Sequence, residues 1–229
     1  MIDHYDWAGG REAMIRLGPD TGPVVIVALP LFEEANRTRT FAMGMMRRLA
    51  TQGIASALPD LPGQGESIVA TEHAMMAGWR AAYAAAAAHL GRPAIALGMR
   101  GGALLDHDAS LAGRWHLAPA QGAALIRELL RAQAMSGVQI NIDLTDASDL
   151  AAPVLIAGNR VARPLLRDIN AAFPVRDGNV RVVRLATDPA VADLKVVGAP
   201  LWRQAEPGDD PALANLLAAD IADWIARCG

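Results

Sequence analysis

The sequence has almost no cysteine, no long apolar run and no excess of basic residues, and each absence excludes a class of protein. Its one cysteine, Cys228, is the penultimate residue, so there is no disulfide framework and no cysteine cluster for a metal. No window approaches the roughly 18 consecutive apolar residues of a membrane span, and residues 1–6 lack a basic or apolar leader pattern. The 21 basic and 24 acidic residues give a net charge of −3, which offers no basic surface to nucleic acid or an anionic membrane. We therefore expect a cytoplasmic protein.

Motifs for a metal or a nucleotide cofactor are also lacking. Gly63-Gln64-Gly65 has neither the third glycine nor the helix-opening context of a dinucleotide loop. The acidic residues and histidines show no metal-ligand spacing. We expect no cofactor, and a small-molecule ligand rather than nucleic acid as the partner; a homodimer stays an open alternative.

The length and the hydrophobic content of the chain suit a single α/β domain with one large hydrophobic core. The chain has 229 residues, of which 52% are hydrophobic. Residues 23–30 are a β-branched run without alternation, as expected for a strand covered on both faces. Strand-like and helix-like segments then alternate with short connections up to residue 98. This order predicts a doubly wound, mostly parallel sheet with functional groups at the carboxyl ends of its strands.

The expected elements follow from apolar periodicity and from Gly and Pro punctuation. We expect an N-terminal hairpin that turns at Gly9-Gly10. Further strands are expected at residues 23–30, 54–58, 93–98, 153–158, 180–185 and 194–197, and helices at residues 37–52, 72–90, 103–111, 119–135, 164–173 and from 211 onward. A cap insertion is expected at about residues 112–150, with residues 137–149 mostly loop. The whole of residues 1–229 is taken as one domain.

The chain is organised around a strand-turn-helix pattern at residues 93–105. Gly98 and Gly102 stand two positions before and after Arg100, which is the spacing of a nucleophile elbow. In that device a strained turn lifts one side chain above the end of a parallel sheet. Here the lifted residue is an arginine, so the scaffold resembles a hydrolase while the serine, cysteine or aspartate nucleophile is missing.

Two stretches place the chain near a known family. Asp60-Leu-Pro-Gly-Gln-Gly-Glu-Ser67 is similar to the Asp-x-x-Gly-x-Gly-x-Ser loop of α/β-hydrolases, and it precedes the elbow by one helix and one strand. Within that superfamily the chain most resembles the exosortase A system-associated hydrolase 2 type, found near bacterial exopolysaccharide and protein-sorting genes. That closer resemblance rests on residues 30–36, 98–105, Trp115 with residues 125–135, and 198–204. It implies a hydrolase of unknown substrate in which arginine at the elbow is a family feature.

A serine hydrolase of this fold also needs an acid and a histidine after the nucleophile. Asp188 follows the strand predicted at residues 180–185, where the family fold supplies the acid, but an Asp-Pro turn is an equally good interpretation. Residues 198–202, where the histidine belongs, contain none. Of the five histidines, only His116 at the start of the predicted cap is expected over the pocket. The others are taken as surface or packing residues.

Arg100 itself cannot be a nucleophile or base, because guanidinium stays protonated. A cation at a helix N-terminus meets the positive end of the helix dipole, so something negative should compensate it. Two alternatives stay open. Arg100 pairs internally with Glu33, Glu34 or Asp60, or it anchors a ligand carboxylate or phosphate together with free helix N–H groups.

The candidate ligand-binding residues are therefore those expected around this turn: Arg100, Gly101, Phe32, Glu33, Asn36, His116 and Trp202. No catalytic residue is assigned with assurance, and Glu33, Glu34 and Asp188 are the acidic candidates. Asn36 is also interpreted as a helix cap, and Trp202 as a core residue.

Three functions fit this sequence. In the first, a hydrolase-fold protein without the serine mechanism binds a small anionic metabolite or acyl compound at the former site. In the second, a hydrolase or acyltransferase uses Glu33 or Glu34 to activate water. In the third, a non-catalytic partner of an exopolysaccharide or sorting system uses the fold as an interaction surface. An apolar pocket above Arg100 would favour the first two, and a site filled by Arg–Glu pairs would favour the third.

Overall fold

A mostly parallel eight-stranded sheet forms the centre of the molecule, as the sequence predicts. The computed structural model describes residues 1–138, 140, 142 and 152–228. The strand order is β1-β2-β4-β3-β5-β6-β9-β10; β1 pairs antiparallel with β2 and β2 antiparallel with β4, and the other neighbours are parallel. The strands of this sheet are β1 Ile2–Trp7, β2 Gly10–Leu17, β3 Val24–Ala28, β4 Ala55–Pro59, β5 Ala94–Met99, β6 Gly113–Leu117, β9 Val180–Leu185 and β10 Leu194–Val196.

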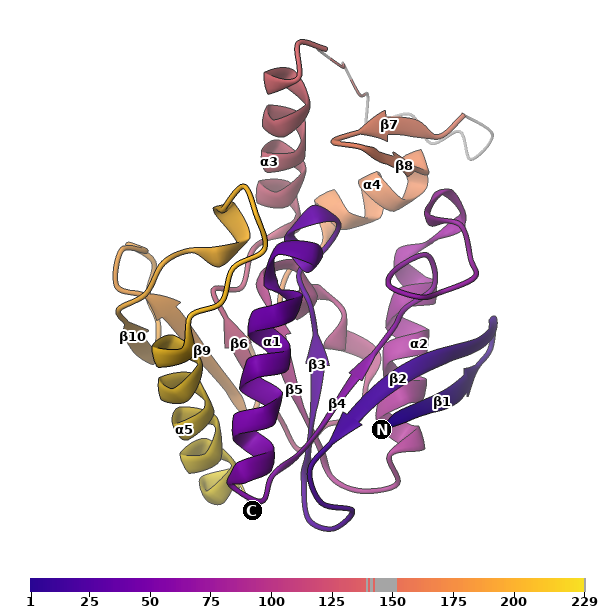
Figure 1. Ribbon diagram of the computed structural model, residues 1–229. Helices are drawn as coiled ribbons and strands as arrows, with labels where there is room; N and C mark the ends of the chain where they lie inside the picture. The colour runs from indigo at the N-terminus through magenta and orange to yellow at the C-terminus, as the bar shows by residue number, and fades with distance from the viewer. Residues whose placement is uncertain (139, 141, 143–151, 229) are drawn as a thin grey trace.

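Helices cover both faces of this sheet (Figure 1). The α-helices are α1 Glu33–Thr51, α2 Met76–His89, α3 Gly122–Met135, α4 Arg163–Ala171 and α5 Pro211–Cys228, and the short 3₁₀ helices are η1 Thr71–His73, η2 Arg100–Leu104, η3 Asp106–Asp108 and η4 Leu201–Arg203. α1 and α5 pack together over one face, where Met46, Trp115 and Leu217 are fully buried. α2 and α4 belong to a second core on the other face, around Trp79 and Tyr83. Because β3 and β5 are buried on both faces, they need the unbroken apolar runs seen in the sequence.

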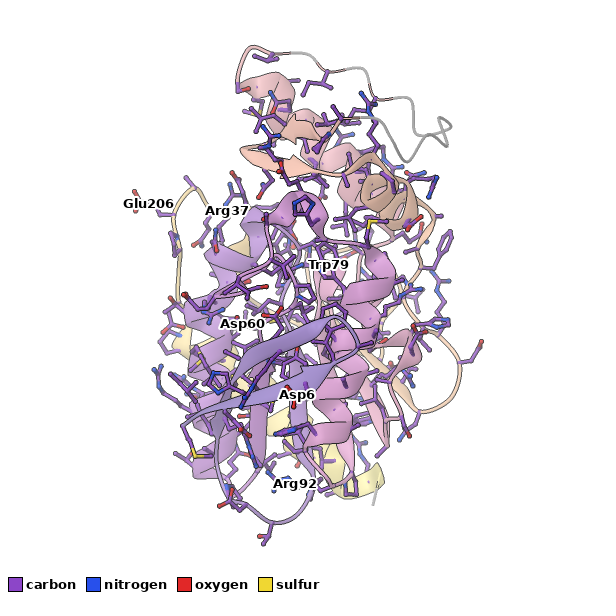
Figure 2. The ribbon with its side chains drawn as sticks, turned by 90° about the vertical axis from the view of Figure 1, so that its right-hand side faces the viewer. Asp6, Arg37, Asp60, Trp79, Arg92 and Glu206 are labelled. Atoms are coloured by element: carbon purple, nitrogen blue, oxygen red, sulfur yellow. The ribbon has the colours of Figure 1, made fainter. Side chains whose placement is uncertain are left out.

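A small cap stands beyond the carboxyl ends of the strands (Figure 1). It consists of α3, the antiparallel pair β7 Val154–Ile156 and β8 Asn159–Val161, and α4, which packs against α3. Figure 2 shows Arg37 and Trp79 at this end of the body and Arg92 at the opposite end. The predicted loop at 137–149 lies largely outside the described residues.

The predicted start of the cap at residue 112 is wrong, because residues 113–117 form β6 between β5 and β9. This strand was not predicted because Arg114 and His116 have polar side chains. Both alternate with buried Trp115 and Leu117, and both are accommodated by Asp106 rather than by solvent. When burial is judged from residue type alone, a strand with this pattern is mistaken for an exposed loop between two elements.

The start of α1 is also corrected. The helix begins at Glu33 instead of residue 37, so Asn36 lies within its first turn and is not its cap. Phe32 precedes the helix with φ 57°, a left-handed conformation that side chains rarely adopt. Two acidic residues in the first turn, Glu33 and Glu34, stabilise this end of the helix through its dipole. The tight turn therefore places both carboxylates at the carboxyl end of β3.

No helix among the described residues is both long enough and apolar enough to cross a membrane.

Candidate functional site

The turn after β5 has the strained geometry of an elbow. Arg100 has φ 53°, and the chain leaves it in η2. A Cβ at Gly98 would lie 2.8 Å from the Cα of Ala103, and one at Gly102 would lie 2.2 Å from the carbonyl oxygen of Ala28. Only glycine permits these approaches, so the predicted role of both glycines in a tight turn fits the geometry.

The helix predicted at residues 103–111 is wrong in type. The segment instead forms η2 and η3, with Leu105 between them. Asp106 in η3 is fully buried, and its Oδ2 lies 2.7 Å from Nε2 of His116, within hydrogen-bond distance. This buried contact draws the chain towards β6 and away from a regular helix.

Arg100 is buried in a cluster of two carboxylates and one indole. Its side chain donates to Glu34 through Nε and Nη2, both at 3.3 Å, and to Glu128 Oε2 through Nη2 at 2.5 Å. The guanidinium carbon lies 5.2 Å from the centroid of the Trp202 ring, within cation–π range. Arg100 as a whole is only 8% exposed. The predicted internal compensation of this cation by Glu34 is therefore present.

The two carboxylates share one guanidinium. Burial raises the pKa of Glu34 above its ordinary value, and the negative charge of Glu128 acts in the same direction, while Arg100 opposes both. Arg203 approaches the other oxygen of Glu128 at 3.7 Å from a more exposed position. The place where a nucleophile would stand thus holds a cation whose charge is already balanced by protein groups.

The other two predicted partners of Arg100 pair elsewhere. Glu33 binds Arg37, one helical turn along α1, at 2.9 Å. Asp60 lies 3.6 Å from Arg39, and burial raises the pKa of its carboxyl despite that cation. Of the three predicted partners, only Glu34 pairs with Arg100 in the described structure.

A small cleft opens beside this cluster, between the first turn of α1 and the cap helix α3. Its volume is about 90 Å³. The walls are mainly apolar, with charged groups at one side, and consist of Leu31, Phe32, Glu33, Glu34, Arg37, Leu125, Glu128, Leu129, Ala132 and Ala157. Arg37, labelled in Figure 2, lies under the cap and also donates to the carbonyl oxygen of Trp202. The cleft is much smaller than the roughly 300–1,000 Å³ of typical ligand pockets.

The structure gathers four of the remaining candidates near the cleft and separates two from it. Phe32 lines the cleft and packs edge-on against Trp79, with ring centroids 6.1 Å apart. A Cβ at Gly101 would lie 2.7 Å from Leu125, so this glycine allows α3 to approach the elbow. Trp202 is 7% exposed and lies under Arg100, as its interpretation as a core residue predicts, while its predicted contact with a ligand stays a prediction. Glu33 lines the cleft as described above.

Asn36 and His116 do not line the cleft. Asn36 lines a neighbouring groove with Arg39 and Gln64. His116 is in β6, is fully buried and contacts Asp106. The expectation that it lies over the site followed from the misplaced start of the cap.

Sequence reasoning missed Glu128. This residue comes from α3, three positions after Leu125, next to the apolar stripe that marks the buried side of the helix. A carboxylate beside such a stripe is a signal for a buried cationic partner. The identity of that partner could not be read from the sequence, since it depends on how the cap folds over the elbow.

Asp188 occupies a turn. It follows β9, and its Oδ2 accepts a hydrogen bond from Arg184 at 2.7 Å while Oδ1 accepts the backbone N–H of Ala190 at 2.9 Å. Burial works against its charge, but these bonds and the nearby Lys195 leave its pKa below the ordinary value. The contacts of this carboxylate within the described residues fit the turn interpretation.

Solved structures of similar shape agree with this architecture. Est1E from Butyrivibrio proteoclasticus with ferulic acid bound matches with a TM-score of 0.65 at 16% identity over 98% of both chains. Mouse alpha/beta hydrolase domain-containing protein 10 matches with a TM-score of 0.64 at 15% identity over 100% of both chains. The chain has the α/β-hydrolase fold.

The same fold carries other named activities. The bottromycin epimerase BotH, in complex with bottromycin A2, matches with a TM-score of 0.57 at 16% identity over 96% of this chain and 98% of that one. At such identities the likeness shows the fold alone. No protein-family model and no curated protein matches the sequence. These comparisons therefore give no support to the exosortase-associated resemblance.

No group of three or more His, Cys, Asp or Glu residues suited to a metal ion occurs in the described part of the chain.

Proposed function

We propose that this protein binds a small, largely apolar ligand in the cleft between α1 and α3 without serine-hydrolase chemistry. The observation that carries the proposal is the burial of Arg100 between Glu34 and Glu128 at the elbow. A protonated guanidinium in this position can neither attack a carbonyl group nor accept a proton. The cleft beside the elbow has mainly apolar walls, with charged groups along one side.

The ligand's charge follows from the groups that are already paired. An anion at Arg100 would have to displace Glu34 or Glu128, which leaves a desolvated carboxylate without its cation. A ligand group that is a cation or a hydrogen-bond donor can instead approach Glu34 and Glu128, because these two carboxylates share the single positive charge of Arg100. We therefore favour a ligand with an amine or hydroxyl group over the anionic metabolite expected from the sequence.

The size of the cleft limits how much of the ligand is enclosed. A volume of about 90 Å³ holds a short alkyl group and not a whole drug-sized molecule. The bound group is expected between Leu125 and Leu129 on the α3 side and Leu31 on the other.

Trp202 provides a direct test, because it lies under Arg100 at the edge of the site. Hexylamine, hexanol and hexanoate are titrated while tryptophan fluorescence is recorded. We expect saturable changes with the amine or the alcohol, weaker ones with the acid, and none in Trp202→Phe. A stronger response to hexanoate would overturn the proposed ligand charge.

Two alanines of α3 form a matched pair of variants. Ala132 lines the cleft, whereas Ala134 is exposed and does not line it. Ala132→Phe is expected to abolish binding, and Ala134→Phe to preserve it. Equal affinities in the two variants would place the ligand elsewhere.

A second function is favoured by the pKa of Glu34. Glu34 lines the cleft, and burial raises the pKa of its carboxyl. A carboxyl with these two properties is suited to act as a general acid or base. It could activate water for hydrolysis without a covalent intermediate. Ester turnover that Glu34→Gln abolishes and a fluorophosphonate leaves intact would establish this function.

The partner role expected from the sequence stays a prediction. The ion cluster at the elbow is the feature that would favour it, but no surface contact points to an exopolysaccharide or sorting partner.

A further inference from the structure

A second hollow lies over β9, away from the elbow. Residues 186–193 connect β9 to the parallel strand β10 without any helix. Parallel neighbours are usually joined by a crossover helix that covers the sheet. Val183 and Leu185 of β9 are buried on the α5 side, whereas Val180 and Val182 on the opposite face are only half-buried. Part of the sheet surface is thus left without a covering helix.

This uncovered strip forms the floor of a cavity of about 480 Å³. That volume falls within the usual range for small-molecule sites and is far larger than the elbow cleft. Its walls are partly apolar and partly polar, with Val180, Val182 and Val191 among the apolar residues and Arg176, Arg184 and Asp193 among the charged ones. Val191 is 92% exposed at the rim, so the cavity is open to a ligand.

The charges around this cavity leave one cation without a partner. Arg176 makes no ion pair or hydrogen bond within the described part of the chain, whereas Arg184 is paired with Asp188 at 2.7 Å. The one acidic wall residue, Asp193, accepts the backbone N–H of Val182 at 2.7 Å, which leaves its negative charge in place. The wall thus carries charges of both signs, and Arg176 is the cation that no described carboxylate holds in an ion pair.

Two buried nitrogens at the same wall also lack partners. His116 is fully buried, and its Nε2 contacts Asp106 while its Nδ1 has no hydrogen-bond partner. Nε of Arg184 is likewise unpartnered.

We propose that this groove over β9 binds a small organic anion with an apolar body, of the alkyl or aryl carboxylate class. The apolar body covers Val180 and Val182, and the carboxylate meets Arg176. The site is separate from the cleft at Arg100, so the proposal stands or fails independently of the proposed function.

Backbone amide NMR with decanoate, and with decanol as the uncharged comparison, tests the location and the charge together. We expect decanoate to shift the resonances of residues 180–182 and 190–192, and decanol to bind about tenfold more weakly because it cannot pair with Arg176. Shifts confined to residues 125–132 would overturn the proposal, as would equal affinity for decanol.

A pair of charge reversals supplies the matched control. Arg47 of α1 is exposed and also makes no ion pair within the described residues, but it does not line the cavity. Arg176→Glu is expected to weaken decanoate binding about tenfold or more, and Arg47→Glu to leave it unchanged. Val182→Phe, which fills the floor, should remove binding of both ligands. Retention of full affinity in Arg176→Glu would contradict the proposed anion site, whatever the folding of Val182→Phe.

Discussion

The elbow cleft and the groove over β9 differ in how their charges are used. At the elbow, Arg100 is held by Glu34 and Glu128, and the space beside them is about 90 Å³. Over β9, a cavity of about 480 Å³ has Arg176 on its wall with no partner in the described residues. The position that carries chemistry in a serine hydrolase is thus filled and balanced, while a region without a covering helix keeps both space and charge.

The largest expected difference between the two regions concerns stability. Arg100→Met leaves Glu34 and Glu128 without their shared cation, and breaking a buried pair costs about 3–5 kcal/mol. We take about 3 kcal/mol in the free energy of unfolding at pH 7, because Glu128 is partly exposed. Arg176→Met should change it by less than about 0.5 kcal/mol. Urea denaturation measures both.

The pH dependence of the Arg100→Met penalty has a definite sign. Without Arg100, burial holds the pKa of Glu34 still further above its ordinary value. The folded variant then binds a proton more tightly than the unfolded chain, and stability is regained as pH falls through that raised pKa. A penalty that grows towards acid pH would contradict this account.

A double-mutant cycle sharpens the picture of one cation shared by two acids. Glu34→Gln and Glu128→Gln should each cost about 1 kcal/mol or less, because Arg100 keeps one charged partner. The double variant leaves Arg100 unpaired and should cost about 3 kcal/mol, so the coupling energy is about 1–2 kcal/mol. Strict additivity in urea denaturation would mean that the carboxylates act separately.

A small effect on stability is also expected beside the groove over β9. Asp188→Asn releases Arg184 from its ion pair, and the pair is partly exposed, so the cost is below about 1 kcal/mol. Since the pKa of Asp188 is lowered in the folded protein, the wild-type advantage is present at neutral pH and is lost as pH falls through that lowered pKa. Thermal melts at pH 7 and near pH 3 measure this loss.

The same variant, Asp188→Asn, should increase the difference in unpaired positive charge between the groove over β9 and the elbow cleft. With Arg184 freed, the cavity wall has a second unpaired cation, and the affinity for decanoate should rise a fewfold. Unchanged decanoate affinity in an NMR titration would show that Arg184 does not face the ligand.

The sequence was sufficient where local patterns determine the structure. The buried runs of β3 and β5 and the glycines at 98 and 102 predicted the sheet and the elbow, because strand burial and tight turns leave direct marks on residue type. Local reasoning also gave Glu34 as one of several possible partners of Arg100, because both residues follow neighbouring parallel strands, but it did not select Glu34 over Glu33, Asp60 or a ligand anion.

The rest depended on contacts between distant segments. Strand β6 was missed because Arg114 and His116 are buried against Asp106, a contact that no periodicity reveals. Glu128 reaches the elbow only through the way α3 folds across Gly101. The groove over β9 arises from a helix that is absent between β9 and β10, and such an opening is visible only in three dimensions.

The central claim is that the elbow holds a balanced ion cluster in place of a nucleophile, and the most direct measurement is the intact mass of the protein after incubation with a fluorophosphonate, alongside turnover of activated short-chain esters. The account predicts an unchanged mass, and predicts that any ester turnover survives the reagent. A single adduct that also abolishes turnover would show an activated serine outside the elbow and would contradict the account.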